Sequence, residues 1–202
     1  MLFRSFDARR DGFVMGEGAG VLVLERAETA KRRGAPILGE IRGYGITNDA
    51  HHLVAPRPDG RGAIVAIQKA LTDAGLEPGD IDYVNAHGTG TPANDRSETR
   101  ALKAVLGDRA KDVPVSSLKS AIGHLIGAAG AVESVATLLA LRARVAPPTL
   151  NWGVAEDGLD LDYVPNESRP LATNGNGQAV ALSNAFGFGG HNSVLVFSAN
   201  GT

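Results

Sequence analysis

The feature that most constrains the fold is the alternation of strand-like and helix-like segments along most of the chain. Short apolar runs of the strand type occur at 37–49, 81–88 and 112–120. Segments with helically spaced apolar residues follow the first two of these runs, at 60–76 and 92–107. Alternation of this kind favours a mixed or parallel sheet with helices packed on its faces. The sequence therefore predicts an α/β fold.

Further segments extend this pattern. A strand is expected at 21–24, followed by a helix that stops at Gly34. The stretch 124–144 is apolar on nearly all sides and is expected to form one long buried helix. Three more strands are expected at 159–165, 178–186 and 192–198.

Composition excludes several classes of function. None of the 202 residues is a cysteine, which rules out disulfides, cysteine metal sites and a thiolate nucleophile from this chain. The formal net charge is −2 and no run of Lys or Arg occurs, which argues against a nucleic-acid partner. The histidines show no metal-ligand spacing. Polar residues interrupt the apolar stretch 125–141, and no signal core opens the chain, so we expect a cytoplasmic protein without a membrane span.

His87 ends the expected strand 81–88 and precedes a small polar loop that contains Thr89 and Thr91. In open α/β sheets, ligands bind beyond the ends of the strands, and glycines in such a loop let a ligand approach the backbone. A histidine there can present a titratable nitrogen to a pocket. Two interpretations stay open, a structural histidine and a catalytic one, and for a single histidine the structural interpretation is favoured.

His124 follows the expected strand 112–120 and opens the expected helix 124–144. A helix N-terminus disfavours the imidazolium form, and a neutral imidazole can donate to a developing oxyanion. Lys119 precedes it in the same loop, and Glu133 follows in an otherwise apolar segment. A buried carboxylate needs a partner, so we expect a Lys119–Glu133 pair, with a structural role and a role in tuning the histidines about equally favoured.

Two other groups of residues are candidates. Asp95 and Glu98 are three positions apart on the expected helix 92–107 and share one face, where they either fix the His87 loop or stay solvated. Phe188 lies between glycines in FGFGG, where its ring could act as a gate and its N–H could point into a pocket. Taken alone, this stretch favours the other interpretation, an ordinary glycine-rich hairpin with a core aromatic.

Together, four motifs point to a known family. DGFVMGEGAGVLVLE, VNAHGTGTP, SLKSAIGHLIGAAGAVES and SNAFGFGG occur here in the order found in β-ketoacyl-acyl-carrier-protein synthases. The chain resembles the elongating type II enzymes of bacterial fatty-acid synthesis from Arg4 to about Phe197. Related polyketide synthase subunits share much of this pattern.

The resemblance implies a thiolase-like fold, in which two similar α/β halves form five layers. Residues 1–38 would be the tail of the N-terminal half, and residues 39–202 the C-terminal domain, with a mixed sheet and helices on both faces. The family's reaction is a decarboxylating Claisen condensation of an acyl thioester with malonyl-acyl carrier protein in fatty acid biosynthesis. The nucleophilic cysteine of the family would lie in a half that precedes Arg4, so the isolated chain is expected not to condense acyl chains.

The resemblance also implies roles for individual residues. His87 and His124 would bind the malonyl thioester and support its decarboxylation. Lys119 and Glu133 would lie behind them in a polar network, and Phe188 would be the gate, with its amide in the oxyanion hole. The pantetheine arm would accept hydrogen bonds from two hydroxyls, those of Thr89 and Thr91.

The implied partners and alternatives complete these expectations. The substrates would be carried on the phosphopantetheine of acyl carrier protein, with no other cofactor and no metal. The full-length enzyme would be a homodimer, and Arg4 and Arg57 are candidates for contact with the acidic carrier. A polyketide ketosynthase and a non-catalytic partner of the chain-length-factor type stay open as alternatives. Without the missing half, the chain would expose apolar surface.

Overall fold

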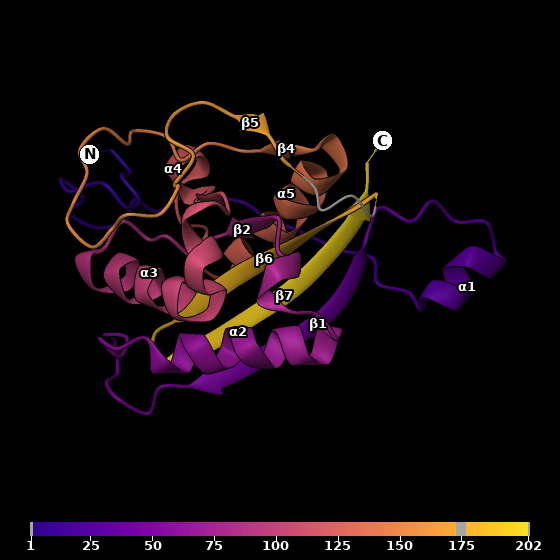
Figure 1. Ribbon diagram of the computed structural model, residues 1–202, viewed down its shortest axis with the longest axis horizontal. Helices are drawn as coiled ribbons and strands as arrows, with labels where there is room; N and C mark the ends of the chain where they lie inside the picture. The colour runs from indigo at the N-terminus through magenta and orange to yellow at the C-terminus, as the bar shows by residue number, and fades with distance from the viewer. Residues whose placement is uncertain (1, 173–176, 202) are drawn as a thin grey trace.

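The computed structural model describes residues 2–172 and 177–201 and contains a five-stranded mixed sheet (Figure 1). Its order is β1-β7-β6-β2-β3. Strand β2 is parallel to both β3 and β6, whereas β7 is antiparallel to both β1 and β6. The bounds are β1 Glu40–Asn48, β2 Tyr83–Asn85, β3 Val115–Ser116, β6 Gln178–Gly187 and β7 His191–Asn200. The predicted α/β class with a mixed sheet is confirmed.

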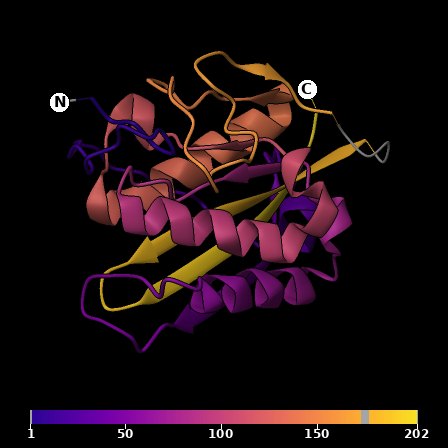
Figure 2. The same cartoon turned by 60° about the vertical axis from the view of Figure 1, so that its left-hand side comes forward.

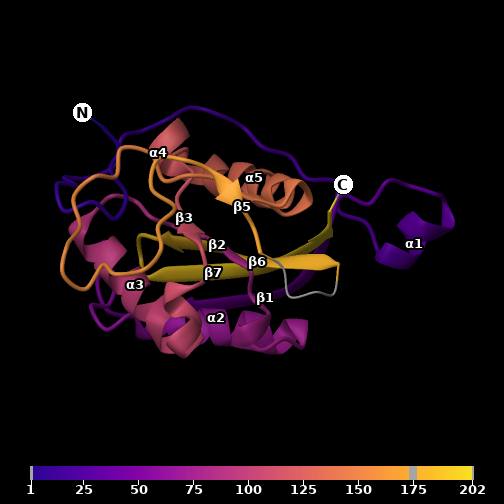
Figure 3. The same cartoon turned by 45° about the horizontal axis from the view of Figure 1, so that its top comes forward.

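Helices cover both faces of this sheet, as predicted (Figure 3). Helices α2 (Arg61–Ala74) and α3 (Pro92–Leu106) pack side by side on one face (Figure 2). Helix α5 (Ala129–Ala143) packs on β6 and β7 from the other face. The shorter elements are α1 Ala27–Arg32, η1 Pro78–Asp80, η2 Gly107–Lys111, α4 Lys119–Ile122, η3 Ile126–Ala128, β4 Val145–Ala146 and β5 Arg169–Pro170.

The two faces of the sheet have separate apolar cores, and β6 shows why. Val180 and Leu182 belong to the core under α2 and α3, whereas Ala179 and Ala181 belong to the core under α5. Successive side chains of a strand point to opposite faces, so a strand covered on both sides is apolar at every position. This explains the continuous apolar run in β6.

Helix α2 approaches β1 closely because two glycines face it. A Cβ atom built on Gly45 would lie 1.9 Å from the carbonyl oxygen of Ala66, and one on Gly43 would lie 2.6 Å from that of Ala70. Both distances are far below van der Waals contact. The glycines of the predicted strand 37–49 are therefore a requirement of helix packing.

Two predicted strands are wrong. Residues 21–24 are extended but have no strand partner within the described part of the chain, and the side chains of Val21, Val23 and Leu24 are 86%, 90% and 71% exposed. Residues 159–165 form an irregular segment with isolated bridges. An apolar pattern alone does not make a strand, because a strand also needs a neighbour for its backbone groups.

The predicted helix 124–144 is also corrected. Regular α-helix begins only at Ala129, after the η3 turn, and only a third of the window Ile126–Ala143 is buried. One face of α5 packs on the sheet while the other carries exposed side chains such as Leu139. By length and composition the window could cross a membrane, but core helices of soluble proteins pass the same test.

Candidate active site

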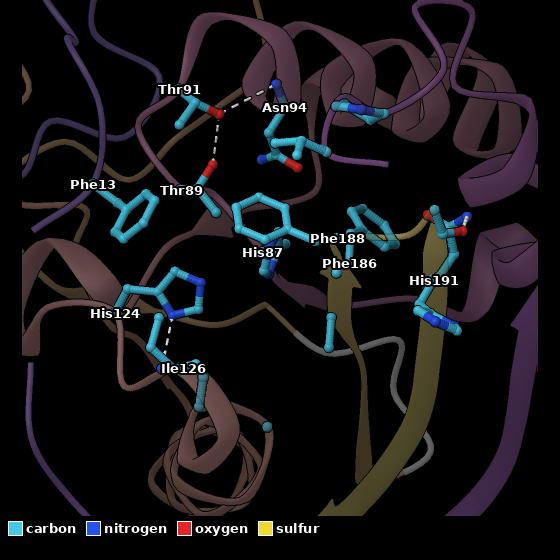
Figure 4. A pocket seen from close by; sticks show the side chains of 18 of the residues that line it. Phe13, His87, Thr89, Thr91, Asn94, His124, Ile126, Phe186, Phe188 and His191 are labelled. Atoms are coloured by element: carbon cyan, nitrogen blue, oxygen red, sulfur yellow. Dashed lines mark hydrogen bonds between the residues drawn. The ribbon is translucent and has the colours of Figure 1, made fainter. Parts of the chain in front are cut away.

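A pocket of about 480 Å³ lies where β2 and β6 end and β7 begins (Figure 4). Because β2 and β6 are parallel, their carboxyl ends meet at one edge of the sheet, which is where ligands bind in α/β folds. His87 lies two residues beyond the end of β2, Phe186 lies near the end of β6, and Phe188 lies in the turn that follows β6. His124 and Phe13 reach the pocket from loops.

His87 is buried and is held from behind by Glu98 of α3. The Glu98 carboxylate accepts hydrogen bonds from the backbone N–H groups of His87 and Gly88, both at 2.8 Å. It also accepts one from the side chain of Asn184 at 3.0 Å. Burial raises the pKa of Glu98, and these donors oppose that effect. Glu98 therefore fixes the His87 loop, and the alternative that it stays solvated is excluded.

His124 lies between α4 and η3 rather than at the start of a helix, so the predicted helix position is wrong. Its backbone N–H donates to Val14, and its carbonyl accepts from Gly16. Its ring Nδ1 accepts a hydrogen bond from the N–H of Ile126 at 3.1 Å. In a neutral imidazole the other nitrogen then carries the proton, so Nε2 is the donor. Figure 4 shows this nitrogen turned toward the middle of the pocket.

The two histidine rings meet edge to face, with their centroids 5.6 Å apart. Phe13 packs against His124 at 5.3 Å, and Phe186 packs against His87 at 5.6 Å. Burial lowers the pKa of His124 to about 4 and that of His87 well below its usual value, and the cation of Lys119 adds to both effects. Both rings are therefore neutral at physiological pH.

The predicted pair of Lys119 and Glu133 is confirmed as a contact. The Nζ of Lys119 lies 2.6 Å from a carboxylate oxygen of Glu133, and both side chains are almost fully buried. The side chain of Asn85 donates to the second oxygen at 3.4 Å. Burial raises the pKa of Glu133, and the nearby ammonium lowers it. The ammonium of Lys119 thus acts on the histidines by lowering their pKa values, and the carboxylate of Glu133 compensates for the burial of Lys119.

Asp95 connects the His87 loop to the N-terminal segment. Its carboxylate accepts hydrogen bonds from the N–H groups of Phe6 at 2.7 Å and Gly90 at 3.2 Å. Asp95 is completely buried, and burial raises its pKa to about 7. Nearby, the hydroxyls of Thr89 and Thr91 lie 2.8 Å apart, and Thr91 caps α3 by accepting from the N–H of Asn94.

Phe188 occupies the tip of the β6–β7 hairpin and lines the pocket with a ring that is 66% exposed. The next residue, Gly189, has a positive φ of 81° and donates its N–H to the carbonyl of Leu53 at 2.7 Å. The predicted hairpin is therefore present, but the prediction that its aromatic residue belongs to the core is wrong. The role of a gate stays a prediction.

Sequence reasoning missed Phe13, Phe186 and Asn184, which contact the histidines or the carboxylate behind them. Phe13 stands in the motif DGF, but nothing in its spacing indicates contact with a residue more than a hundred positions away. Among the described residues, no group of three or more potential ligands could hold a metal ion. The arrangement offers two neutral imidazoles in a mainly apolar pocket, which suits hydrogen bonding to an oxyanion.

Two family models match the chain. The model of the β-ketoacyl synthase C-terminal domain matches residues 38–153, more than half of the chain, and that of the N-terminal domain matches residues 2–30. The chain belongs to the β-ketoacyl synthase family. The predicted family and its thiolase-like fold are therefore confirmed.

Relatives and solved structures agree with this family. The chain is 55% identical to 3-oxoacyl-[acyl-carrier-protein] synthase 2 of Synechocystis and 50% identical to that of Staphylococcus aureus strain COL, over 96% of this chain. It covers 45% and 46% of those proteins, so it spans about half the length of the curated relatives it matches.

Two solved ketosynthase structures are also similar. A β-ketoacyl synthase from Burkholderia phymatum has a TM-score of 0.87 at 42% identity, over 97% of this chain and 46% of that chain. A type II polyketide ketosynthase, solved with its acyl-carrier protein and bound to a hexaketide, has a TM-score of 0.91 at 41% identity, over 96% of this chain and 47% of that one.

Proposed function

We propose that this chain supplies the two-histidine part of the active site of a 3-oxoacyl-[acyl-carrier-protein] synthase. The observation that carries the proposal is the pair of neutral imidazoles, His87 and His124, that meet in one pocket. The 50–55% identity to proteins named for this activity supports it. The whole enzyme condenses an acyl thioester with malonyl-acyl carrier protein in fatty acid synthesis.

Decarboxylation is the step that the two histidines serve. The bond between the malonyl carboxylate and the methylene carbon breaks, CO₂ leaves, and the electron pair moves onto the thioester oxygen as an enolate. The Nε2–H of His124 and a ring N–H of His87 donate to this oxygen. Neutral donors in an apolar pocket stabilise the developing charge better than water does, because they need no reorganisation.

Carbon–carbon bond formation follows. The enolate carbon attacks the carbonyl carbon of an acyl group held as a thioester on a cysteine, and the thiolate leaves. That cysteine comes from outside this sequence, which has none. Phe188 gates the pocket, and its amide contributes to the oxyanion hole, while Thr89 and Thr91 bind the pantetheine arm. The isolated chain is therefore inactive in condensation.

The same proposal covers partners and location. Acyl carrier protein delivers both substrates, as the solved complex of a related ketosynthase with its carrier supports. The whole enzyme acts as a homodimer in the cytoplasm and uses no metal, membrane or nucleic acid. Residues 39–202 form its C-terminal domain. The polyketide alternative is less favoured because the type II polyketide ketosynthase is 41% identical, below the 50–55% of the relatives named 3-oxoacyl-[acyl-carrier-protein] synthase 2.

A chimera tests this function. In the chimera, this chain replaces the matching segment of the Synechocystis relative. The chimera is incubated with acyl carrier protein that carries an acyl group and with malonyl-acyl carrier protein, and the product is followed by mass spectrometry. The chimera should form 3-oxoacyl product, and His87→Ala or His124→Ala should each lower its rate by about 10²- to 10³-fold, the usual effect of losing one oxyanion donor.

The matched control is His51→Ala, which removes an exposed histidine outside the pocket and should leave the rate unchanged. A folded chimera without product would overturn the proposal, as would condensation by the isolated chain. A product carrying several unreduced keto groups would favour the polyketide alternative.

A further inference from the structure

Next to His87, both the N–H and the carbonyl of Gly88 are held by hydrogen bonds to side chains. The Gly88 N–H donates to Glu98, and its carbonyl accepts from the hydroxyl of Ser117 at 2.8 Å and from that of Ser5 at 2.6 Å. Both lone pairs of this carbonyl are therefore used. Gly88 has a φ of 40°, and a Cβ atom there would lie 2.6 Å from the side chain of Ser117, so no other residue fits this position.

Glycine at this position leaves the backbone next to His87 free to rotate unless its neighbours restrain it. Glu98 fixes the peptide that joins His87 to Gly88, and the two serines fix the peptide that follows. Without the serines, only one side of the glycine would be held. The backbone beside His87 is thus held by the serine hydroxyls as well as by Glu98.

Ser5 is held firmly enough to serve in this way. It is completely buried, and the next residue, Phe6, donates its N–H to Asp95 and stacks its ring on Tyr163 with centroids 4.3 Å apart. Phe6 has a φ of 61°, which is unusual for a bulky residue and persists only where surrounding contacts impose it. These contacts anchor the backbone of Ser5 beside Gly88, and the Ser5 hydroxyl donates from that fixed position.

We propose that Ser5 is a positioning residue for His87, and that it completes with Ser117 a clamp on the Gly88 carbonyl. Ser5 lies in the segment that matches the N-terminal family domain, whereas His87 and Ser117 lie in the segment that matches the C-terminal domain. The clamp thus makes the orientation of one histidine depend on a residue of the other domain. The effect of the clamp on catalysis rests on the proposed function, whereas its hydrogen bonds are present whatever the function is.

The first test uses NMR of the chimera described above, with isotope labels on histidine and glycine. Ser5→Ala and Ser117→Ala should each shift the ring signals of His87 and the amide signal of Gly88, and the double variant should shift them by more than the sum. The pair Ser5→Thr and Ser5→Val differs only in the hydroxyl, so it decides the question should Ser5→Ala fail to fold. Ser5→Thr should keep the original signals of His87, and Ser5→Val should not.

The matched control is Thr47→Val, which removes another hydroxyl that donates to a carbonyl, that of Gly62 at 2.7 Å, and neither residue lines the pocket. It should leave the His87 signals unchanged. In the chimera, Ser5→Ala should lower kcat by about 2- to 10-fold, the worth of one hydrogen bond, with KM unchanged. Unchanged His87 and Gly88 signals in folded Ser5→Ala or Ser5→Val would overturn the clamp, whereas an inactive parent chimera would overturn only the proposed function.

Discussion

At the scale of single residues, the site depends on groups that keep two imidazoles neutral and correctly turned. The family motifs and elementary chemistry predicted His87, His124 and the buried partners behind them. They could not predict Ser5, because its hydroxyl meets the Gly88 carbonyl across 83 positions of sequence. A contact of this kind depends on how the chain folds back, which no local spacing records.

A pH titration by NMR tests the neutral state. The ring signals of His87 should stay those of neutral imidazole from pH 8 down to pH 6.5, because burial lowers its pKa well below the usual value, and those of His124 should reach their midpoint near pH 4 because its pKa is lowered to about 4. Lys119→Met removes a nearby cation and should raise the pKa of both histidines. A midpoint for His87 at or above pH 6.5 in the original chain would contradict this account.

Removal of the carboxylate behind His87 should destabilise the fold. Glu98→Ala leaves the N–H groups of His87 and Gly88 buried without an acceptor, which should lower the free energy of unfolding by about 3 kcal/mol. Urea denaturation measures this change. Glu28→Ala, at an exposed position of α1, is the control and should change stability by less than about 0.5 kcal/mol. Equal stability of the two variants would show that Glu98 is dispensable.

At the scale of helices and strands, the sequence predicted best where packing repeats a regular pattern. The apolar spacing predicted helices α2 and α3. Gly75 correctly marked the end of α2, and Pro92 correctly marked the start of α3. The strand predicted at 21–24 failed because strand formation needs a partner that the pattern does not name. The helix at 124–144 failed in its first turn, where His124 is instead tied to Val14 and Gly16.

The close packing of α2 on β1 gives a prediction at this scale. Gly45→Ala places a methyl group against the carbonyl of Ala66, so the helix must move away and the free energy of unfolding should fall by about 2–3 kcal/mol. Thermal unfolding followed by circular dichroism measures the loss. Gly79→Ala is the control, since its added methyl meets nothing within 4 Å. Similar melting temperatures for both variants would mean that β1 does not need glycine.

At the scale of the whole molecule, one face of the chain is apolar and uncovered. A groove of about 770 Å³ lies between residues 21–26, the start of β1 and α5, and its rim includes Val21, Val23 and Leu139. Figure 1 shows α1 and its flanking segments extending away from the body. Exposed apolar patches of this kind mark surfaces that bind other protein.

The isolated chain should therefore self-associate at micromolar concentration. Val23→Lys combined with Leu139→Lys should lower its apparent mass in light scattering and reduce the binding of a hydrophobic dye at least about twofold. Leu53→Lys is the control, because Leu53 is also a highly exposed apolar residue but lies outside the groove and is bonded to Gly189 of the β6–β7 hairpin. An original chain that stays monomeric and binds no dye would refute the expectation.

The order of the sheet has a consequence for biosynthesis. Strand β1 pairs only with β7 in this sheet, and β7 follows every other strand of the sheet in the sequence. At ribosomal speeds of about 5–20 residues per second, roughly 7–30 s pass between the synthesis of β1 and that of β7. During that time the backbone groups of β1 that pair with β7 have no strand partner and are accessible to chaperones. Since β7 is the last strand of the sheet to be made, β1 and the pocket wall formed by His191 and Asn192 are the last parts to join it.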